Sequence, residues 1–392
     1  MQVGSKLIAG LASLSVAAAG LAGSALTRDQ SNSGTDAGDE ARRAYGVRIN
    51  QLQQIGAHNA YHREAPDDEK KIQLAQEPGA VGLFYSHASI PDQLEDQNVR
   101  MVELDLFPDP QGGLYTYPLV RKLAGKGRLT DPDLARPGIK VLHWADFDYG
   151  TTCSTFVKCL TQVKSWSDAH PKHAPITIQL ELKQSDPRLV AAGGVQSPPW
   201  NLDNLNSIDT EIRSVFPEPQ LLSPDDVRRD GLTLEQSVLA TGWPTLGQAQ
   251  GKVMFFFDNG GPGAIRDAYR EGRPSLEGRA VFTRGPEGQP DAAVTMVNDP
   301  RGTNQAEIQR LVKKGYMVRT RSDEPMSTVL TNETSRVGIA LGSGAQWVTT
   351  DFPVAGMAAR YDSDFVAKLP GNTAVRCNPV AAPAWCGNAL ER

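Results

Sequence analysis

The chain has 392 residues, enough for one large barrel or two ordinary domains. Its hydrophobic fraction of 40% and charged fraction of 22% are those of an ordinary globular protein. The formal net charge of -5 argues against broad nucleic-acid binding, which needs a basic surface, and against gross electrostatic docking on anionic lipid.

The N-terminus has the pattern of an export signal. Lys6 provides a positive charge ahead of the apolar run 7–21, and Gly23 and Ala25 fit a cleavage site near Ala25. The run is short for a membrane span, so removal is favoured over retention as an anchor. We expect residues 1–25 to be a signal peptide of a secreted protein. Residues 26–45 then form a flexible linker, since residues 27–40 lack large apolar side chains.

Residues 46–392 are expected to form one domain of alternating strands and helices. Most candidate strands carry apolar residues on both faces, which suits a parallel sheet covered by helices. The candidate strands are residues 52–55, 101–106, 140–143, 176–182, 253–257, 294–297, 317–320 and 347–349. Helical spacing is clearest in residues 154–168, 202–216 and 304–314, the last with Thr303 as its cap.

This alternation predicts an α/β fold, a single irregular (β/α)₈ barrel of the TIM type. Long segments rich in turn formers separate some of the elements, namely residues 112–138, 185–201 and 259–289. In a barrel, the loops that follow strands lie on the catalytic face. Polar residues at the ends of strands are therefore the first candidates for a functional site.

The four cysteines form two close pairs, Cys153 with Cys159 and Cys377 with Cys386. An exported protein meets an oxidising compartment, so disulfides are expected. Four cysteines allow three connectivities, and proximity along the chain favours the local one. The rival interpretation, a zinc site, is weak because neither pair has CxxC spacing.

Three carboxylates and an amide follow or interrupt the apolar strands. Glu103 and Asp105 stand two apart, which puts both on one face of a strand, about 6.6 Å apart along the backbone. Two acids in one barrel end are costly without a cation between them. Glu181, in the strand 176–182, is a third carboxylate, and Asn59 offers an amide oxygen. This hard, all-oxygen set favours Ca²⁺ or Mg²⁺ over zinc, and exported proteins meet abundant Ca²⁺.

Two histidines also lie at strand ends. His58 follows the first strand and could donate to a phosphoryl oxygen or move a proton, whereas capping a turn is the structural alternative. His143 ends the third candidate strand and is expected to be the general acid for a leaving alkoxide. Lys183 is a candidate phosphate contact, with a structural ion pair to Glu181 as a serious rival. His62 stands four residues after His58, a spacing that could suggest zinc, but no HExxH string is present.

The ordered set His-Asn, Glu-x-Asp, His and Glu resembles the catalytic half of Ca²⁺-dependent phosphoinositide-specific phospholipases C. The stretches 89–94 (SIPDQL) and 99–105 (VRMVELD) look like that family's lead-in to its second strand. Residues 258–259 and 350–353 extend the resemblance to the bacterial and fungal group, from Val47 onward. The ending 347–353 also resembles glycerophosphodiester phosphodiesterases, which share the barrel.

The resemblance implies roles for individual residues. Ca²⁺ would be held by Asn59, Glu103, Asp105 and Glu181. His58 would stabilise the pentavalent phosphoryl centre, Glu103 could take the proton of the attacking inositol hydroxyl, and His143 would protonate the leaving diacylglycerol oxygen. The first product would then be a cyclic inositol phosphate.

The implied partner is phosphatidylinositol or a related inositol lipid at a membrane surface, and no protein partner is implied. The family's basic pair for ring phosphates is not clearly present, since Lys183 is the sole candidate, and this favours plain phosphatidylinositol. Two alternatives remain at this stage. One is another phospholipid diesterase, although glycerophosphodiester enzymes usually show His-Arg-Gly where this chain has residues 58–60 (HNA). The other is an inactive barrel that binds lipid.

Overall fold

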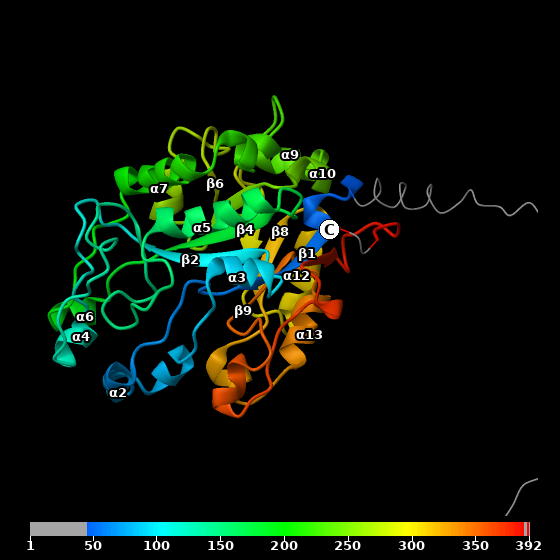
Figure 1. Ribbon diagram of the computed structural model, residues 1–392. Helices are drawn as coiled ribbons and strands as arrows, with labels where there is room; N and C mark the ends of the chain where they lie inside the picture. Colours follow the sequence, from blue (N-terminus) through cyan, green and yellow to red (C-terminus); the bar gives the residue numbers. More distant parts are fainter. Residues whose placement is uncertain (1–44, 388–389, 392) are drawn as a thin grey trace, which may run out of the picture. The chain divides into compact units, whose positions relative to one another are not determined.

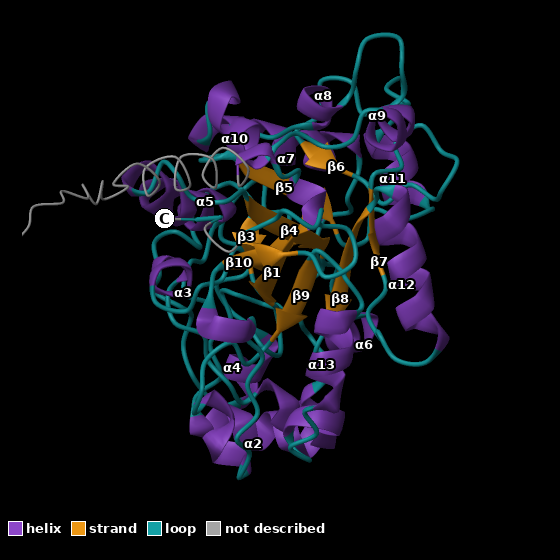
Figure 2. Cartoon of the chain, turned by 90° about the vertical axis from the view of Figure 1, so that its right-hand side faces the viewer, coloured by secondary structure: helices purple, strands orange, loops and turns teal. Residues whose placement is uncertain are grey.

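The computed structural model describes residues 45–387 and 390–391, so the expected signal peptide, and the expected linker up to residue 44, lie outside the described residues. Eight parallel strands lie in the order β6-β5-β4-β2-β1-β9-β8-β7, with helices around them (Figure 1, Figure 2). The strands are β1 (Leu52–Ala57), β2 (Met101–Phe107), β3 (Lys140–Val141), β4 (Ile176–Leu182), β5 (Val253–Phe257), β6 (Val281–Phe282), β7 (Val294–Met296), β8 (Met317–Arg321), β9 (Trp347–Thr350) and β10 (Val375–Cys377). This nearly closed barrel confirms the expected fold class.

Helices link and cover the strands. The α-helices are α2 (Asp67–Gln76), α3 (Ile90–Glu95), α4 (Leu119–Leu123), α5 (Phe156–Ala169), α6 (Pro187–Ala191), α7 (Leu202–Val215), α8 (Pro224–Val227), α9 (Leu234–Ala240), α10 (Leu246–Ala249), α11 (Ala264–Tyr269), α12 (Thr303–Lys314) and α13 (Ser335–Gly342). Short 3₁₀ helices cover Ile49–Gln51, Pro78–Leu83, Glu218–Gln220, Met357–Tyr361 and Pro370–Asn372, and a π-helical turn covers Pro325–Val329. Helix α5 packs on α7, and α12 packs beside β8.

The central strands are buried on both faces, as the apolar runs predict. Every residue of β1 and β2 is buried, and β4 is buried except at Glu181. Gly56 lets β1 approach its two neighbours closely, because a Cβ there would lie 2.8 Å from side-chain atoms of Met101 and Thr349. The helices α5 and α7 begin at side-chain caps, where Thr155 accepts from the amide of Lys158 and Asn201 accepts from that of Asn204.

Three sequence predictions fail in the fold. The predicted third strand, residues 140–143, contains only the two-residue strand β3, which pairs antiparallel with the end of β2 and is not a barrel strand. The missing barrel strand is β6, which lies in the segment 259–289 that was predicted to be a loop. A two-residue strand has too little periodicity to be recognised in a sequence. Helix α12 begins at Thr303 with Gly302 in the cap position, so the expected Thr303 cap is also wrong.

The barrel is open at one seam, between β6 and β7. No pairing joins β6 to β7 within the described part of the chain, and both strands are very short.

The disulfides Cys153–Cys159 and Cys377–Cys386 are both present, which confirms the local pairing. Among the described residues, no helix combines the length and the apolar character needed to span a bilayer.

Candidate active site

Strand register brings the three carboxylates together. Strand β2 pairs with β4 so that Asp105 lies directly opposite Glu181, and Glu103 lies opposite Gln179. One carboxylate oxygen from each of Glu103, Asp105 and Glu181 lies within 4.8 Å of the others. Glu103 and Asp105 are buried, and Glu181 is partly exposed. The alternation of side chains along a strand therefore creates the acidic cluster that the sequence predicts.

Asn59 lies in the turn that follows β1. Its backbone has φ of 48°, the left-handed region that asparagine tolerates better than most residues. The turn is held by hydrogen bonds from the His62 amide to the Asn59 carbonyl and from the Ala60 amide to the Glu103 carbonyl. These bonds tie the turn to β2 beside the acidic cluster. Asn59 is buried, and its side-chain oxygen has no hydrogen-bond partner.

The oxygens of this cluster fit a hard cation. Neither side-chain oxygen of Asp105 accepts a hydrogen bond from the described residues, although both are buried. Burial raises the pKa of Glu103 well above its usual range, despite the nearby Arg319, and raises that of Asp105 to about 7. Buried oxygens that accept no hydrogen bond, here those of Asp105 and the amide oxygen of Asn59, are costly alone but suit Ca²⁺, which binds oxygen ligands of this kind.

Lys183 lies beside two of these carboxylates. Its Nζ is 3.3 Å from Asp105 Oδ2 and 3.1 Å from Glu181 Oε1. Burial lowers the pKa of Lys183, but the two carboxylates outweigh it, so the net shift is upward. The structure therefore contains the ion pair that rivalled a phosphate-binding role. The Lys183 side chain remains 20% exposed.

His58 is held by Asp351. Its Nδ1 lies 2.7 Å from Asp351 Oδ1, and its Nε2 lies 3.8 Å from Glu103 Oε1. Asp351 also accepts from the hydroxyl of Tyr85 at 2.6 Å and from Arg321 at 3.1 Å. Because the pKa of Asp351 is held well below its usual range by His58, Arg321 and Tyr85, against the effect of burial, this carboxylate is ionised and His58 Nδ1 is the donor. Neutral His58 therefore presents a bare Nε2.

The tautomer changes the expected behaviour of His58. A neutral ring with a bare Nε2 accepts a proton there, and it can donate to a phosphoryl oxygen only after it has done so. Burial and the positive charge of Arg321 lower the pKa of His58, while Asp351 opposes them. The imidazole is therefore better prepared to accept a proton than to arrive with one.

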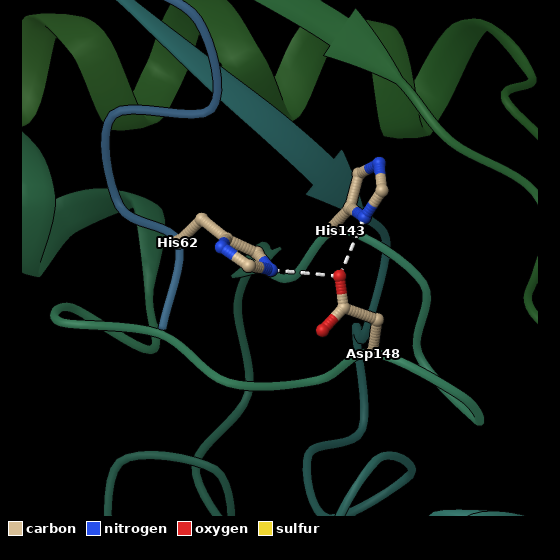
Figure 3. A group of neighbouring side chains, drawn as sticks. All are labelled: His62, His143 and Asp148. Atoms are coloured by element: carbon tan, nitrogen blue, oxygen red, sulfur yellow. Dashed lines mark hydrogen bonds and ion pairs between the residues drawn. The ribbon is translucent and has the colours of Figure 1, made fainter. Parts of the chain in front are cut away.

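His143 is held by a second aspartate. Its Nδ1 lies 2.8 Å from Asp148 Oδ2, and the same oxygen lies 2.8 Å from Nε2 of His62 (Figure 3). His62 is fully buried, whereas the His143 side chain is 19% exposed. The other ring nitrogen of His143 points away from Asp148 (Figure 3). His143 therefore has the same arrangement as His58, with one nitrogen fixed by a carboxylate and the other free.

Both histidines reach one cavity. Its volume is about 230 Å³, and its lining residues include His58, Asn59, His143, Arg321 and Asp351. The segment that carries Tyr85 and the π-helical turn at residues 325–329 provide further wall. The two proposed proton-transfer groups thus face one space next to the acidic cluster.

Several residues of this site were missed in the sequence. Asp351 falls within the stretch 350–353, which carries the family resemblance but predicts no role for it. The pair Arg319 and Arg321 is absent from the predicted site. The signal was present, because two arginines at alternate positions of an apolar strand must share one face. Arg319 donates to Glu103 at 3.1 Å. Asp148 had no recognisable signal, since it lies in an irregular loop. His87 bonds through Nε2 to the His58 carbonyl oxygen at 2.9 Å, a structural contact.

Comparison with known proteins gives a family match and solved structures that are similar to this chain. A model of the family described as phosphoinositide phospholipase C, Ca²⁺-dependent, matches residues 47–379. No curated protein matches the chain. A Ca²⁺-dependent phosphoinositol-specific phospholipase C from Pseudomonas sp has a similar structure, with 19% identity, 86% of this chain and 97% of that chain covered, and a TM-score of 0.50. A Ca²⁺-dependent phosphatidylinositol-specific phospholipase C from Streptomyces antibioticus gives 16% identity, coverage of 78% and 95%, and a TM-score of 0.44.

The fold is an α/β barrel whose strands carry an acidic cluster that could hold a metal. Because the family match spans most of the chain, the protein belongs to the Ca²⁺-dependent phosphoinositide phospholipase C family. It is an enzyme, a phosphodiesterase that acts on phosphoinositides.

Proposed function

We propose that the protein is a secreted, Ca²⁺-dependent phospholipase C that cleaves phosphatidylinositol to diacylglycerol and inositol phosphate through a cyclic inositol phosphate. One observation carries the proposal, namely that a three-carboxylate cluster adjoins two imidazoles that face one cavity, each fixed by its own aspartate. Two disulfides support export, since such bonds persist in oxidising compartments. The proposed metal ligands are Asn59, Glu103, Asp105 and Glu181.

Bound Ca²⁺ would lower the pKa of the attacking inositol hydroxyl and neutralise charge at the phosphoryl group. The protein groups divide the remaining work. Glu103 Oε1 and His58 Nε2 lie 3.8 Å apart, so a hydroxyl beside them can give up its proton there. Glu103 is the first acceptor in this scheme, and the bare Nε2 of His58 takes up the proton. The resulting imidazolium, balanced by Asp351, then donates to a phosphoryl oxygen.

His143 acts at the other end of the reaction. Its Nδ1 donates to Asp148, so a proton on Nε2 can pass to the leaving diacylglycerol oxygen as the ester bond breaks. The attacking hydroxyl belongs to the same inositol ring, and this proximity favours it over water in the first step. Lys183, next to the carboxylates, is proposed to contact the phosphate of the substrate.

The test is product analysis with phosphatidylinositol vesicles. We expect cyclic inositol phosphate to appear first by phosphorus NMR, and we expect EGTA to abolish its release and added Ca²⁺ to restore it. Glu181→Gln should raise the Ca²⁺ concentration needed for half-maximal activity by at least about tenfold, because a charged ligand is lost. The matched control is Glu211→Gln, another largely buried carboxyl group, which accepts from the Ile139 amide and should leave the Ca²⁺ requirement unchanged.

Other outcomes would contradict the proposal. Activity that survives chelation would exclude the metal role. With mixed vesicles that also contain phosphatidylcholine, release of glycerol phosphate or free choline in place of inositol phosphate would indicate another phospholipid diesterase. Undiminished turnover by His58→Ala or His143→Ala would show that the assignment of these histidines is wrong. Export is checked separately by N-terminal sequencing of protein from the culture medium.

A further inference from the structure

One carboxylate oxygen joins two histidines beside the cavity. Asp148 Oδ2 lies 2.8 Å from His62 Nε2 and 2.8 Å from His143 Nδ1, while Asp148 Oδ1 has no partner (Figure 3). The two imidazole rings meet edge-on with centroids 5.8 Å apart. Since an ionised carboxylate only accepts hydrogen bonds, both nitrogens must be donors. Asp148 Oδ2 therefore accepts hydrogen bonds from two imidazoles, the partly exposed His143 and the buried His62.

The ligand atoms of this group are also close enough together for a metal ion. The distances favour hydrogen bonds, because both nitrogen–oxygen separations are those of N–H donors to a charged oxygen. A metal ion would need bare nitrogens at the same positions. We therefore interpret the group as a hydrogen-bonded unit.

The backbone holds this unit rigidly. The segment after Asp148 pairs with the turn that carries His62, through bonds from the Arg63 amide to the Gly150 carbonyl at 3.1 Å and from the Thr152 amide to the Tyr61 carbonyl at 2.8 Å. A Cβ on Gly150 would lie 1.9 Å from the Arg63 carbonyl oxygen, so the two segments are in closest contact there. The nearby Cys153–Cys159 disulfide secures the start of the following helix. Such close packing leaves the Asp148 carboxylate little freedom.

We propose that Asp148 is a positioning residue that fixes His143 with its Nε2 toward the leaving group, and that His62, by sharing the same oxygen, limits how strongly Asp148 retains the His143 proton. This inference rests on the proposed role of His143 as proton donor. The carboxylate alone would make His143 a reluctant donor. The hydrogen bond from His62 to Asp148 weakens the hold of Asp148 on the His143 proton. The hydrogen bond from His143 to Asp148 still keeps the His143 ring in place.

Other charged groups lie near His143 and His62. Asp105 and Glu181, from β2 and β4, are close enough to interact with it electrostatically, and Lys183 lies between them. On the side of His62, the ring of Tyr85 lies 4.6 Å from the His62 ring. Burial lowers the pKa of His62, but Asp148 outweighs it and the net shift is upward. A change at His62 is therefore transmitted to His143 mainly through Asp148.

The first test reads the tautomer directly. Long-range proton–nitrogen NMR correlations of the whole protein should show His143 with its proton on Nδ1 when the ring is neutral. In Asp148→Ala this preference should disappear, while in His62→Gln, which can still donate to Asp148, it should remain. An unchanged His143 tautomer in Asp148→Ala would overturn the proposal. This measurement needs no substrate, so it stands even if phosphatidylinositol proves not to be cleaved.

The second test is the pH profile of kcat/KM on phosphatidylinositol vesicles. The alkaline limb of this profile reports the group that protonates the leaving oxygen. Asp148→Asn should move this alkaline limb to lower pH by about 1–3 units, because a facing negative charge is removed. His62→Leu should move it to higher pH by less than about one unit, because Asp148 then acts on His143 alone, and His62→Gln should restore most of the difference.

A control variant separates the proposed role of His62 from a general loss of stability. His173 is also a buried histidine, bonded to Ser167 and to the Ala174 carbonyl ahead of β4, away from the cavity. His173→Gln should lower the melting temperature without moving the alkaline limb. A limb that stays fixed in His62→Leu, or moves to lower pH, would contradict the proposed role of His62. Stoichiometric zinc in the purified protein, lost in His62→Gln, would replace the hydrogen-bonded unit with a metal site.

Discussion

The two sides of the cavity hold the same pair of groups in different surroundings. On one side His58 donates to Asp351, and on the other His143 donates to Asp148. Asp351 is balanced by Arg321, whose charge is permanent in the physiological range. Asp148 is balanced by His62, which can change its protonation state.

This difference supports the opposite roles that are proposed for the two pairs. Arg321 offsets the charge of Asp351, so His58 gains little help in holding a proton, and its pKa is lowered by burial and by Arg321. Within the described part of the chain, no lysine or arginine forms an ion pair with Asp148, which pairs with His62 and His143. Environments that separate two titratable groups in this way commonly assign one as base and the other as acid. The comparison therefore predicts that His58 receives a proton and His143 provides one.

The largest expected effect comes from removing each imidazole. His58→Ala and His143→Ala should each lower kcat on phosphatidylinositol by about 10²–10⁴, the usual contribution of a general acid or base. With a nitrophenyl ester of phosphoinositol, whose leaving group needs no proton, the loss in His143→Ala should shrink to less than about tenfold. The loss in His58→Ala should stay large with both substrates. Equal losses of kcat for the two variants on both substrates would contradict the proposed roles, in which His58 accepts a proton and His143 donates one.

A smaller effect is expected from Asp351→Asn. This change keeps the shape but removes the charge that stabilises protonated His58. A charge-assisted hydrogen bond contributes about 1.5–3 kcal/mol, so kcat should fall by about 10–100-fold. The loss should be similar for the lipid and the nitrophenyl ester, because His58 acts before the leaving group departs. Rate measurements on both substrates check this, and a loss restricted to the lipid would assign Asp351 to the wrong half of the reaction.

Much of this site can be derived from the sequence, because strand periodicity is local. Glu103 and Asp105 must share a face of any strand that contains them, and Glu181 joins them once β4 pairs beside β2. The cysteine pairs are equally local, and their spacing was sufficient to predict the two disulfides. The predicted fold depended on the long apolar strands, which the barrel contains.

The partners of the histidines could not be derived in the same way. Asp351 lies 293 positions from His58, and no periodicity relates the two. Asp148 is only five positions from His143, but it lies in a loop whose path is set by backbone pairing with the turn at His62. The error at residues 140–143 has the same origin. A short apolar run that ends in a histidine suggests a barrel strand, while tertiary packing turns it back against β2.

Tyr85 lies between the two pairs and offers a finer test. Its hydroxyl donates to Asp351 at 2.6 Å, while its ring lies against His62. Tyr85→Phe keeps the ring and removes one hydrogen bond, so we expect a loss of about 0.5–1.5 kcal/mol in the free energy of unfolding and a fall in kcat below tenfold. The alkaline limb assigned to His143 should not move. Tyr361→Phe, which removes a hydroxyl bonded to the Val81 carbonyl, is the control and should leave kcat unchanged.

The smallest expected effect is a pH dependence of stability that belongs to only one of the two pairs. The pKa of His62 is raised above its ordinary value of 6.5 in the folded protein. The stabilisation from its protonated form is therefore complete below about pH 6.5, the pKa of the unfolded chain, and is lost as pH rises through the folded value. Asp148 adds no slope in this range, because its pKa is lowered, chiefly by His62 and His143 against burial, and it stays ionised.

Urea unfolding of the wild type and His62→Gln between pH 6 and 9 measures this effect. The advantage of the wild type should decrease toward high pH by about 1 kcal/mol, the size of one net hydrogen bond. The matched comparison is Tyr85→Phe, whose cost should stay constant over the same range, since Arg321 keeps its charge and Asp351 stays ionised. If the wild type is more stable than His62→Gln by the same free energy of unfolding from pH 6 to 9, His62 does not titrate in that range. Asp148 and Asp351 would then differ only in the strength of their partners.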